Sequence, residues 1–155
     1  NIFKLVAHAE SNFQPFLRFG GSLLAKQALS GKLRELAILR VAKLSHAEYE
    51  WVQHVPIAKA VGASDAQIAA LDRGAADAPC FDETERLLLR FTAEVVREVG
   101  ARDATYRALA AKLPPRELVE LVLAIGFYMA VARLMETFAI DMDPPAGDRV
   151  MAGIR

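Results

Sequence analysis

The chain has 155 residues, 54% of them hydrophobic, and its 19 basic and 19 acidic residues give a formal net charge of zero. This balance argues against a nucleic-acid-binding surface or an anionic-membrane-binding surface, since both need an excess of basic residues. The single cysteine, Cys80, excludes an intrachain disulfide and a dithiol redox cycle within one subunit.

The length predicts a single domain over residues 1–155. The hydrophobic content exceeds the usual value of about 45–50%, and apolar surface beyond the needs of one core indicates a homo-oligomer. The longest strongly apolar run, residues 121–132, is shorter than the roughly 20 residues of a membrane span. No signal peptide is visible. We therefore expect a soluble, cytoplasmic protein.

The first half of the chain predicts helices separated by short polar breaks. Residues 1–29 are typical of helix with one interruption, where Ser11 or Asn12 is able to cap a second helix. Residues 33–44 are apolar almost all round, apart from a narrow polar strip formed by Arg40 and Lys43, which is typical of an interior helix. Ser45-His46 ends this helix, and residues 47–61 predict the next one.

The second half continues the same pattern. Predicted helix starts share a capping residue or a proline, and they fall at Ser64, Asp82, Asp103 and Pro114-Pro115. The helices they open are expected to run to Asp72, to Val99 before Gly100, to Lys112 and to about Phe138. The tail after Asp141 is expected to be extended or poorly ordered. No stretch alternates as a strand does, so we predict an all-α fold of seven or eight helices.

Three titratable residues lie on the apolar sides of the two central helices. At 100° per residue, Glu50 and His54 fall one turn apart on the apolar arc of residues 47–61. Glu35 lies on the apolar arc of residues 33–44. Because a buried charge must be paired or neutralised, these groups form either a satisfied structural cluster or a reaction centre.

Glu50 and His54 are spaced to form a hydrogen-bonded pair whose acidity near neutral pH suits general acid–base catalysis. Glu35 is a candidate third member that orients His54 or holds a proton. The alternative is a buried pair with a structural role only. A metal site at these residues is not expected, because one imidazole with two carboxylates is a thin ligand set.

Two further residues are candidates for binding a substrate. Arg133 lies in an otherwise apolar helix and is able to bind a substrate carboxylate bidentately, although it is equally able to pair with Glu136 or Glu120. Tyr49 is a core or interface aromatic by default, and its position next to Glu50 makes it the second candidate.

The segment RELAILRVAKLSHAEYEWVQHVPIAKAVG resembles the carboxymuconolactone decarboxylase and alkylhydroperoxidase (AhpD-like) superfamily. That family's pattern is a Glu, a Cys-x-x-Cys beginning twelve residues later, a His four residues after the second Cys, and a Gly eight residues further on. This chain carries Glu35, Ala47, Glu50, His54 and Gly62 in that register. The Glu, His and Gly match, whereas both cysteine positions are replaced. The stretch GFYMAVARL is similar, more loosely, to the family's C-terminal helix.

The resemblance implies a ring-shaped homo-oligomer, a trimer or hexamer, with sites near the subunit contacts. The branch without cysteines implies a decarboxylase-like enzyme that needs no cofactor and acts on a small lactone or carboxylated cyclic substrate, with Glu35, Glu50 and His54 as its catalytic residues. Two alternatives stay open. One is an AhpD-like peroxidase-family protein that has lost its redox cysteines, and the other is a non-catalytic oligomeric binding module.

Overall fold

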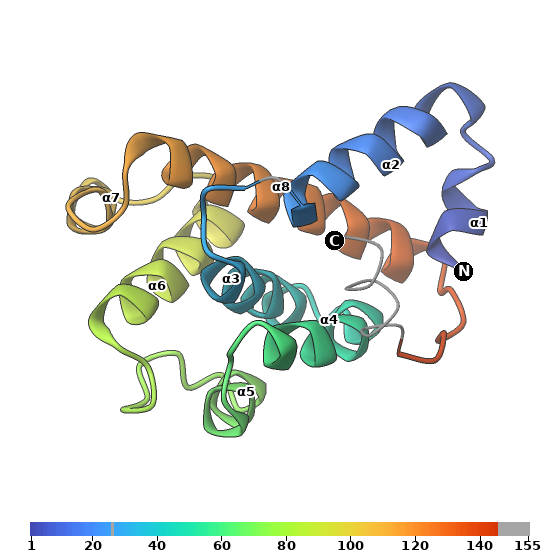
Figure 1. Cartoon of the computed structure of the whole chain (residues 1–155). Coiled ribbons are helices and arrows are strands. Elements are labelled where there is room, and N and C mark those ends of the chain that lie inside the picture. Colours follow the sequence, from blue (N-terminus) through green and yellow to red (C-terminus); the bar gives the residue numbers. More distant parts are fainter. Residues whose placement is uncertain (26, 146–155) are drawn as a thin grey trace.

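The computed structural model of the protein describes residues 1–25 and 27–145, and this part of the chain is all-α (Figure 1). The prediction of fold class is therefore confirmed. The helices, in chain order, are α1 (Ile2–Val6), α2 (Glu10–Ala25), α3 (Gly31–Leu44), α4 (Glu48–Ala60), α5 (Asp65–Asp72), α6 (Glu83–Glu98), α7 (Asp103–Ala110) and α8 (Pro115–Thr137).

Helix α3 lies at the centre of the fold and contacts α4, α5, α6 and α8 (Figure 1). Its apolar side chains explain this position, because Leu36, Ala37, Leu39 and Val41 have no exposed surface at all. The prediction of an interior helix at residues 33–44 is confirmed. Helix α4 turns back along α3 after His46, which takes a left-handed conformation with φ of 55°. The two helices whose apolar arcs carry titratable residues therefore pack against each other.

Most helix boundaries follow the side chains that cap them. Ser64 and Asp82 each form a capping box at the start of α5 and α6, as the sequence predicts. Two predicted boundaries are wrong. Helix α6 ends at Glu98, one residue before the predicted end, and its C-cap Val99, rather than Gly100, takes the left-handed conformation (φ 70°). Arg102 rather than Asp103 is the N-cap of α7, without a side-chain cap hydrogen bond.

Helix α2 begins at Glu10, ahead of the predicted caps Ser11 and Asn12, and crosses α8 closely. A Cβ on Gly20 would come within 2.9 Å of the Phe127 ring, so a larger residue here would have to displace that ring. The Phe127 ring in turn packs against Phe16, with ring centroids 4.9 Å apart.

The segment after α8 is tied to both α4 and the chain's start. Asp143 accepts hydrogen bonds from the Tyr49 hydroxyl and from the terminal amino group of Asn1, and the Gln53 side chain donates to the Asp143 carbonyl oxygen at 2.8 Å. The expected poor order therefore does not apply at Asp143. The rest of the predicted tail, residues 146–155, lies outside the described residues.

Helix α8 is long and apolar enough to cross a membrane by length and composition, with a mean hydropathy of 1.9, although its longest apolar run is short. Half of that apolar window is buried inside the fold, which is typical of a core helix in a soluble protein. Its outer side exposes Val119, Val122 and Leu123. Assembly of copies through such a face stays a prediction, as does the single-domain organisation of the whole chain.

Candidate functional site

Glu35 is the centre of a buried polar cluster between α3, α4 and α8. The side chain is 0% exposed. One carboxylate oxygen, Oε1, accepts from Arg34 Nε at 3.2 Å, and the other, Oε2, lies 2.8 Å from His54 Nδ1. A buried carboxylate is stable only with such partners, because burial removes the hydration of its charge. The structure therefore confirms the sequence prediction that Glu35 is buried and lies beside His54.

His54 projects from α4 toward Glu35, and its ring is almost completely buried. When Nδ1 donates to the Glu35 carboxylate, Nε2 carries no proton in the neutral ring. In the protonated ring Nε2 carries a proton, which it can donate. The predicted hydrogen bond between Glu50 and His54 is wrong. The i,i+4 spacing places both side chains on one side of α4, but the carboxylate of α3 occupies the bonding position at the imidazole.

Glu50 is the least conventional member of the cluster. The side chain is 1% exposed, and neither carboxyl oxygen has a hydrogen-bond partner among the described residues. Burial raises the pKa of Glu50 well above its ordinary range, and the nearby Glu35 carboxylate raises it further. Glu50 is therefore a proton-holding group at a pH where a free glutamate would be ionised.

Tyr128 of α8 completes the cluster, and it was not among the residues predicted from the sequence. Its ring packs edge-on against the His54 ring, with centroids 4.7 Å apart. Burial, and then the carboxyl groups of Glu35 and Glu50, raise the pKa of Tyr128 well above its ordinary range. In the sequence, Tyr128 shares the apolar arc of α8 with Leu121 and Ala124, which predicts that it is buried. The arc does not indicate which residue of another helix it contacts.

The two predicted substrate-binding residues lie apart from this cluster. Tyr49 packs in a separate apolar cluster with Val131 and Met135, and burial together with Asp143 raises the pKa of its hydroxyl. Arg133 is exposed, and its guanidinium donates to the Met129 carbonyl oxygen at 2.7 Å on its own helix. The described structure therefore brings together Glu35, Glu50 and His54 but neither of these two residues.

The cluster lies apart from two cavities of the molecule. Neither of the two cavities that the structure shows most clearly, one between α3 and α6 and an apolar one between α1, α2 and α8, is lined by a residue of the cluster. Among the described residues, no group of three His, Cys, Asp or Glu side chains has a geometry that could hold a metal ion. The polar atoms available for chemistry are thus the two carboxyl groups, the imidazole and the tyrosine hydroxyl.

Comparison with solved structures shows the same fold in a bacterial protein. The crystal structure of a protein of unknown function from Agrobacterium tumefaciens, suggested to be the antioxidant defence protein AhpD, matches with a TM-score of 0.79 and 22% identity. The match covers 89% of this chain and 94% of that chain. No curated protein sequence matches the chain.

A family model provides the closer assignment. It describes the carboxymuconolactone decarboxylase family and matches residues 11–94, more than half of the chain. The matched segment runs from α2 into α6 and contains Glu35, Glu50 and His54. The chain therefore belongs to the carboxymuconolactone decarboxylase family.

Proposed function

We propose that this protein is a cofactor-free acid–base enzyme that decarboxylates, or transfers a proton on, a small lactone or carboxylated cyclic substrate. One observation supports this proposal most strongly. The carboxyl group of Glu50 is buried beside the Glu35–His54 contact and has no hydrogen-bond partner in the described part of the chain. A structural cluster would be expected to satisfy such a group, whereas perturbed titratable groups are concentrated at functional sites.

The chemistry follows from the order of the groups. In a decarboxylation, the bond between the substrate carbon and its carboxylate breaks, carbon dioxide leaves, and the electron pair stays on the carbon. His54 then delivers a proton from Nε2 to that carbon, while Glu35 holds Nδ1 and stabilises the imidazolium beforehand. Burial favours the reaction, because a low-polarity site destabilises the substrate carboxylate more than the charge-dispersed transition state.

Glu50 is proposed as the group that restores the proton to His54. Its raised pKa keeps a proton inside the cluster, and its carboxyl group has no competing acceptor among the described residues. His54 is 8% exposed, against 0% and 1% for the two glutamates, so the substrate reaches the cluster at the histidine.

A second candidate function is an AhpD-like peroxidase-family role, which the suggested identity of the Agrobacterium protein favours. The chemistry of that role is opposed by Ala47 and Glu50 at the two positions where the family pattern has cysteines. Cys80 lies in the segment between α5 and α6, where its sulfur is 3.6 Å from the Ala66 carbonyl oxygen. A thiol peroxidase would therefore need a different cysteine arrangement. The third candidate is an oligomeric binding module in which the cluster only fixes the packing.

The remaining sequence predictions belong to the proposal. We expect a trimeric or hexameric homo-oligomer that is soluble and cytoplasmic, with a small molecule as its partner and neither nucleic acid nor membrane. In such an assembly, Tyr49 and Arg133 would contact substrate only if subunit contacts carry them to a site. Light scattering of the full chain measures the number of subunits directly.

The test is a screen of lactone acids for carbon dioxide release in deuterated water, with His54→Ala and Glu50→Gln compared with the wild type. Decarboxylation by the proposed route places one deuterium on the substrate carbon. We expect both variants to lose at least about a hundredfold in turnover, the lower range of general acid–base contributions. His8→Ala and Glu48→Gln, which alter exposed residues, are the matched controls and are expected to keep full activity.

Unchanged turnover in both site variants would end the assignment. Peroxide consumption with a thiol reductant, abolished in Cys80→Ser, would favour the peroxidase role instead. Loss of oligomerisation in the site variants, without a substrate for the wild type, would favour the binding module.

A further inference from the structure

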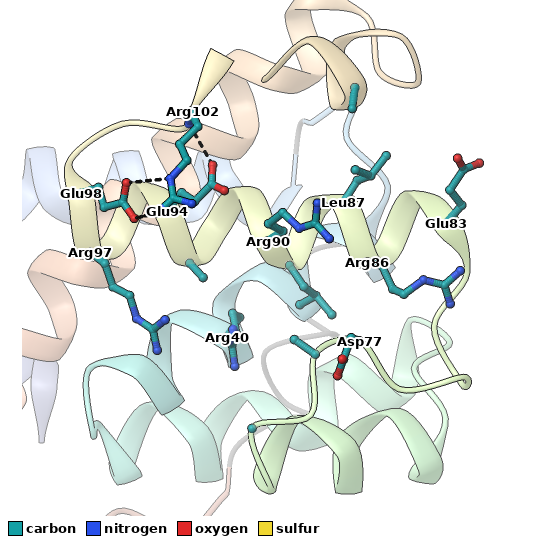
Figure 2. Close-up of a pocket in the computed structure, with 15 residues that line it drawn as sticks. Arg40, Asp77, Glu83, Arg86, Leu87, Arg90, Glu94, Arg97, Glu98 and Arg102 are labelled. Atoms are coloured by element: carbon teal, nitrogen blue, oxygen red, sulfur yellow. Dashed lines mark hydrogen bonds and ion pairs between the residues drawn. The ribbon is translucent and has the colours of Figure 1, made fainter. Parts of the chain in front are cut away.

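A charged cleft of about 650 Å³ lies between α3 and α6, away from the Glu35 cluster (Figure 2). Its volume falls within the usual range of small-molecule sites, roughly 300–1,000 Å³. The charged residues that line it are Arg40, Arg86, Arg90, Arg97, Arg102, Asp77, Glu83, Glu94 and Glu98. Which of these charges are already paired decides what the cleft can bind.

Three of the four carboxylates are already occupied. Glu98 is held by the Arg102 guanidinium through two contacts of 2.6 and 3.2 Å. Glu94 accepts from the Arg102 backbone N–H and from the Thr105 hydroxyl, each at 2.9 Å. Glu83 pairs with a lysine of the following segment at 2.7 Å. Glu83 and Glu98 are therefore neutralised by cations of their own, which leaves Glu94 and the exposed Asp77 to face the four remaining arginines of the cleft.

The guanidiniums of Arg40, Arg90 and Arg97 form no ion pair with any residue in the described part of the chain. Arg86 donates to a backbone carbonyl, that of Phe81, rather than to a carboxylate. The cleft consequently holds an excess of positive charge on side chains whose donors lack an anionic acceptor.

Arg40 shows the imbalance most clearly. Its Nε is buried and has no hydrogen-bond partner among the described residues. Figure 2 shows the Arg97 side chain extending from α6 to the side of α3 on which the Arg40 side chain lies. Burial lowers the pKa of Arg40, and the charge of Arg97 lowers it further. Two guanidiniums held this way repel each other until an anion lies between them.

We propose that Arg40 and Arg97 form a binding site for a small oxyanion, a molecule bearing a phosphate or carboxylate group, with Arg90 at the rim. Guanidinium groups suit this ligand, because their planar forks donate two parallel hydrogen bonds to phosphate or carboxylate oxygens. The site is separate from the proposed acid–base cluster and does not depend on its function.

The test is isothermal titration calorimetry of the full chain with inorganic phosphate and, separately, with succinate, at an ionic strength held constant with sodium chloride. We expect saturable binding of at least one anion with one site per chain. Tighter binding of phosphate would indicate a phosphorylated ligand, and tighter binding of succinate would indicate a carboxylic acid.

Variants locate the site. Arg40→Gln and Arg97→Gln are each expected to weaken binding at least about tenfold, since hydrogen bonds to charged groups contribute about 1.5–3 kcal/mol and 1.4 kcal/mol is tenfold. Arg107→Gln is the matched control, with the same change of charge on an exposed arginine of α7 outside the cleft, and it is expected to bind as the wild type does. Since Arg97 is exposed, its variant keeps the test valid even if Arg40→Gln does not fold.

Three results would overturn the proposal. The first is no saturable binding of either anion, and the second is equal weakening in Arg107→Gln and Arg97→Gln. The third is that neither anion binds the wild type and that Arg97→Gln forms a smaller oligomer than the wild type by light scattering. A carboxylate of a second copy would then be the partner of these arginines.

Discussion

Helix α3 contributes to two regions of the molecule in which charge is balanced in different ways. On one side, the buried Glu35 carboxylate contacts Arg34 and His54, and Glu50 lies near it without a hydrogen-bond partner among the described residues. On the other side, the guanidinium of Arg40 faces a cleft with more arginines than free carboxylates. The same helix therefore contributes to a buried cluster in which acidic and basic groups are equal in number and to an open cleft in which basic groups are in excess.

The difference shows how burial decides the means of neutralisation. Where water is excluded, the unpaired carboxyl group of Glu50 keeps its proton, because an ionised form would be neither hydrated nor paired. Where the cleft is open, arginines cannot give up their protons, since a guanidinium stays charged at any ordinary pH. The open region can be neutralised only by an anion from outside. The buried region is suited to proton transfer and the open one to ligand binding.

The largest expected effect comes from removing the centre of the buried cluster. Glu35→Ala would leave the Arg34 guanidinium and the His54 imidazole buried without their acceptor. Breaking a buried ion pair from one side costs about 3–5 kcal/mol, so we expect a loss of that size in the free energy of unfolding. Urea denaturation at neutral pH measures it.

Glu117→Ala is the control, because Glu117 also follows an arginine near the start of its helix, in the first turn of α8, but is only half-buried. A first-turn glutamate contributes about 0.3–1 kcal/mol through the helix dipole, which is the loss expected here. Similar losses in the two variants would show that Glu35 acts through its helix position alone.

The second effect is a dependence of stability on pH caused by Glu50. Its folded pKa lies above the unfolded value, so the folded state holds a proton that the unfolded state has released. Stability is then greatest below the unfolded pKa and falls as pH rises toward the folded pKa, by up to about 1.4 kcal/mol per pH unit. Glu50→Gln carries no such proton and is expected to remove this slope.

Urea denaturation at several pH values between about 5 and 8 measures the slope. This pH range lies above the ordinary glutamate pKa of about 4.3. Glu48→Gln, an exposed residue of the same helix, is expected to keep the wild-type slope. An unchanged slope in Glu50→Gln would mean that Glu50 ionises normally in the folded protein, and the contrast between the two regions would fail.

The sequence was sufficient for the all-α fold and for the burial of the trio, because both follow from periodicity within single helices. It was not sufficient to choose between Glu35 and Glu50 as the hydrogen-bond partner of His54. The spacing of Glu50 and His54 fixes a shared side of α4, but which neighbouring helix lies against that side is a matter of tertiary packing. The same limit hid Tyr128, whose arc predicted burial without indicating a ring contact with His54.

The arginine cleft was hidden for a related reason. Arg40 was identified as part of a narrow polar strip on an interior helix, and nothing in the sequence assigns a partner to that strip. The arginines that face it come from α6, more than forty residues later in the chain. Their mutual repulsion exists only because the fold packs α3 against α6.

The smallest expected effect concerns this repulsion. Arg97→Gln removes the charge that opposes the buried guanidinium of Arg40, while the side chain itself is exposed and loses no ion pair with any described residue. We expect stability to change by at most about 0.5 kcal/mol, and upward, in a buffer without phosphate or carboxylate. The gain should shrink when salt is raised to about 0.15 M, where the screening length is about 8 Å.

Arg107→Gln breaks a 3.5 Å surface pair with Asp103 and is expected to shift stability slightly downward under the same conditions. A gain in stability for Arg97→Gln and a loss for Arg107→Gln, although both remove one positive charge, would show that the cleft holds an excess of positive charge. A loss of stability in Arg97→Gln in that anion-free buffer would instead mean that Arg97 already has an acceptor in the folded protein, and that the cleft has no need of an anion from outside.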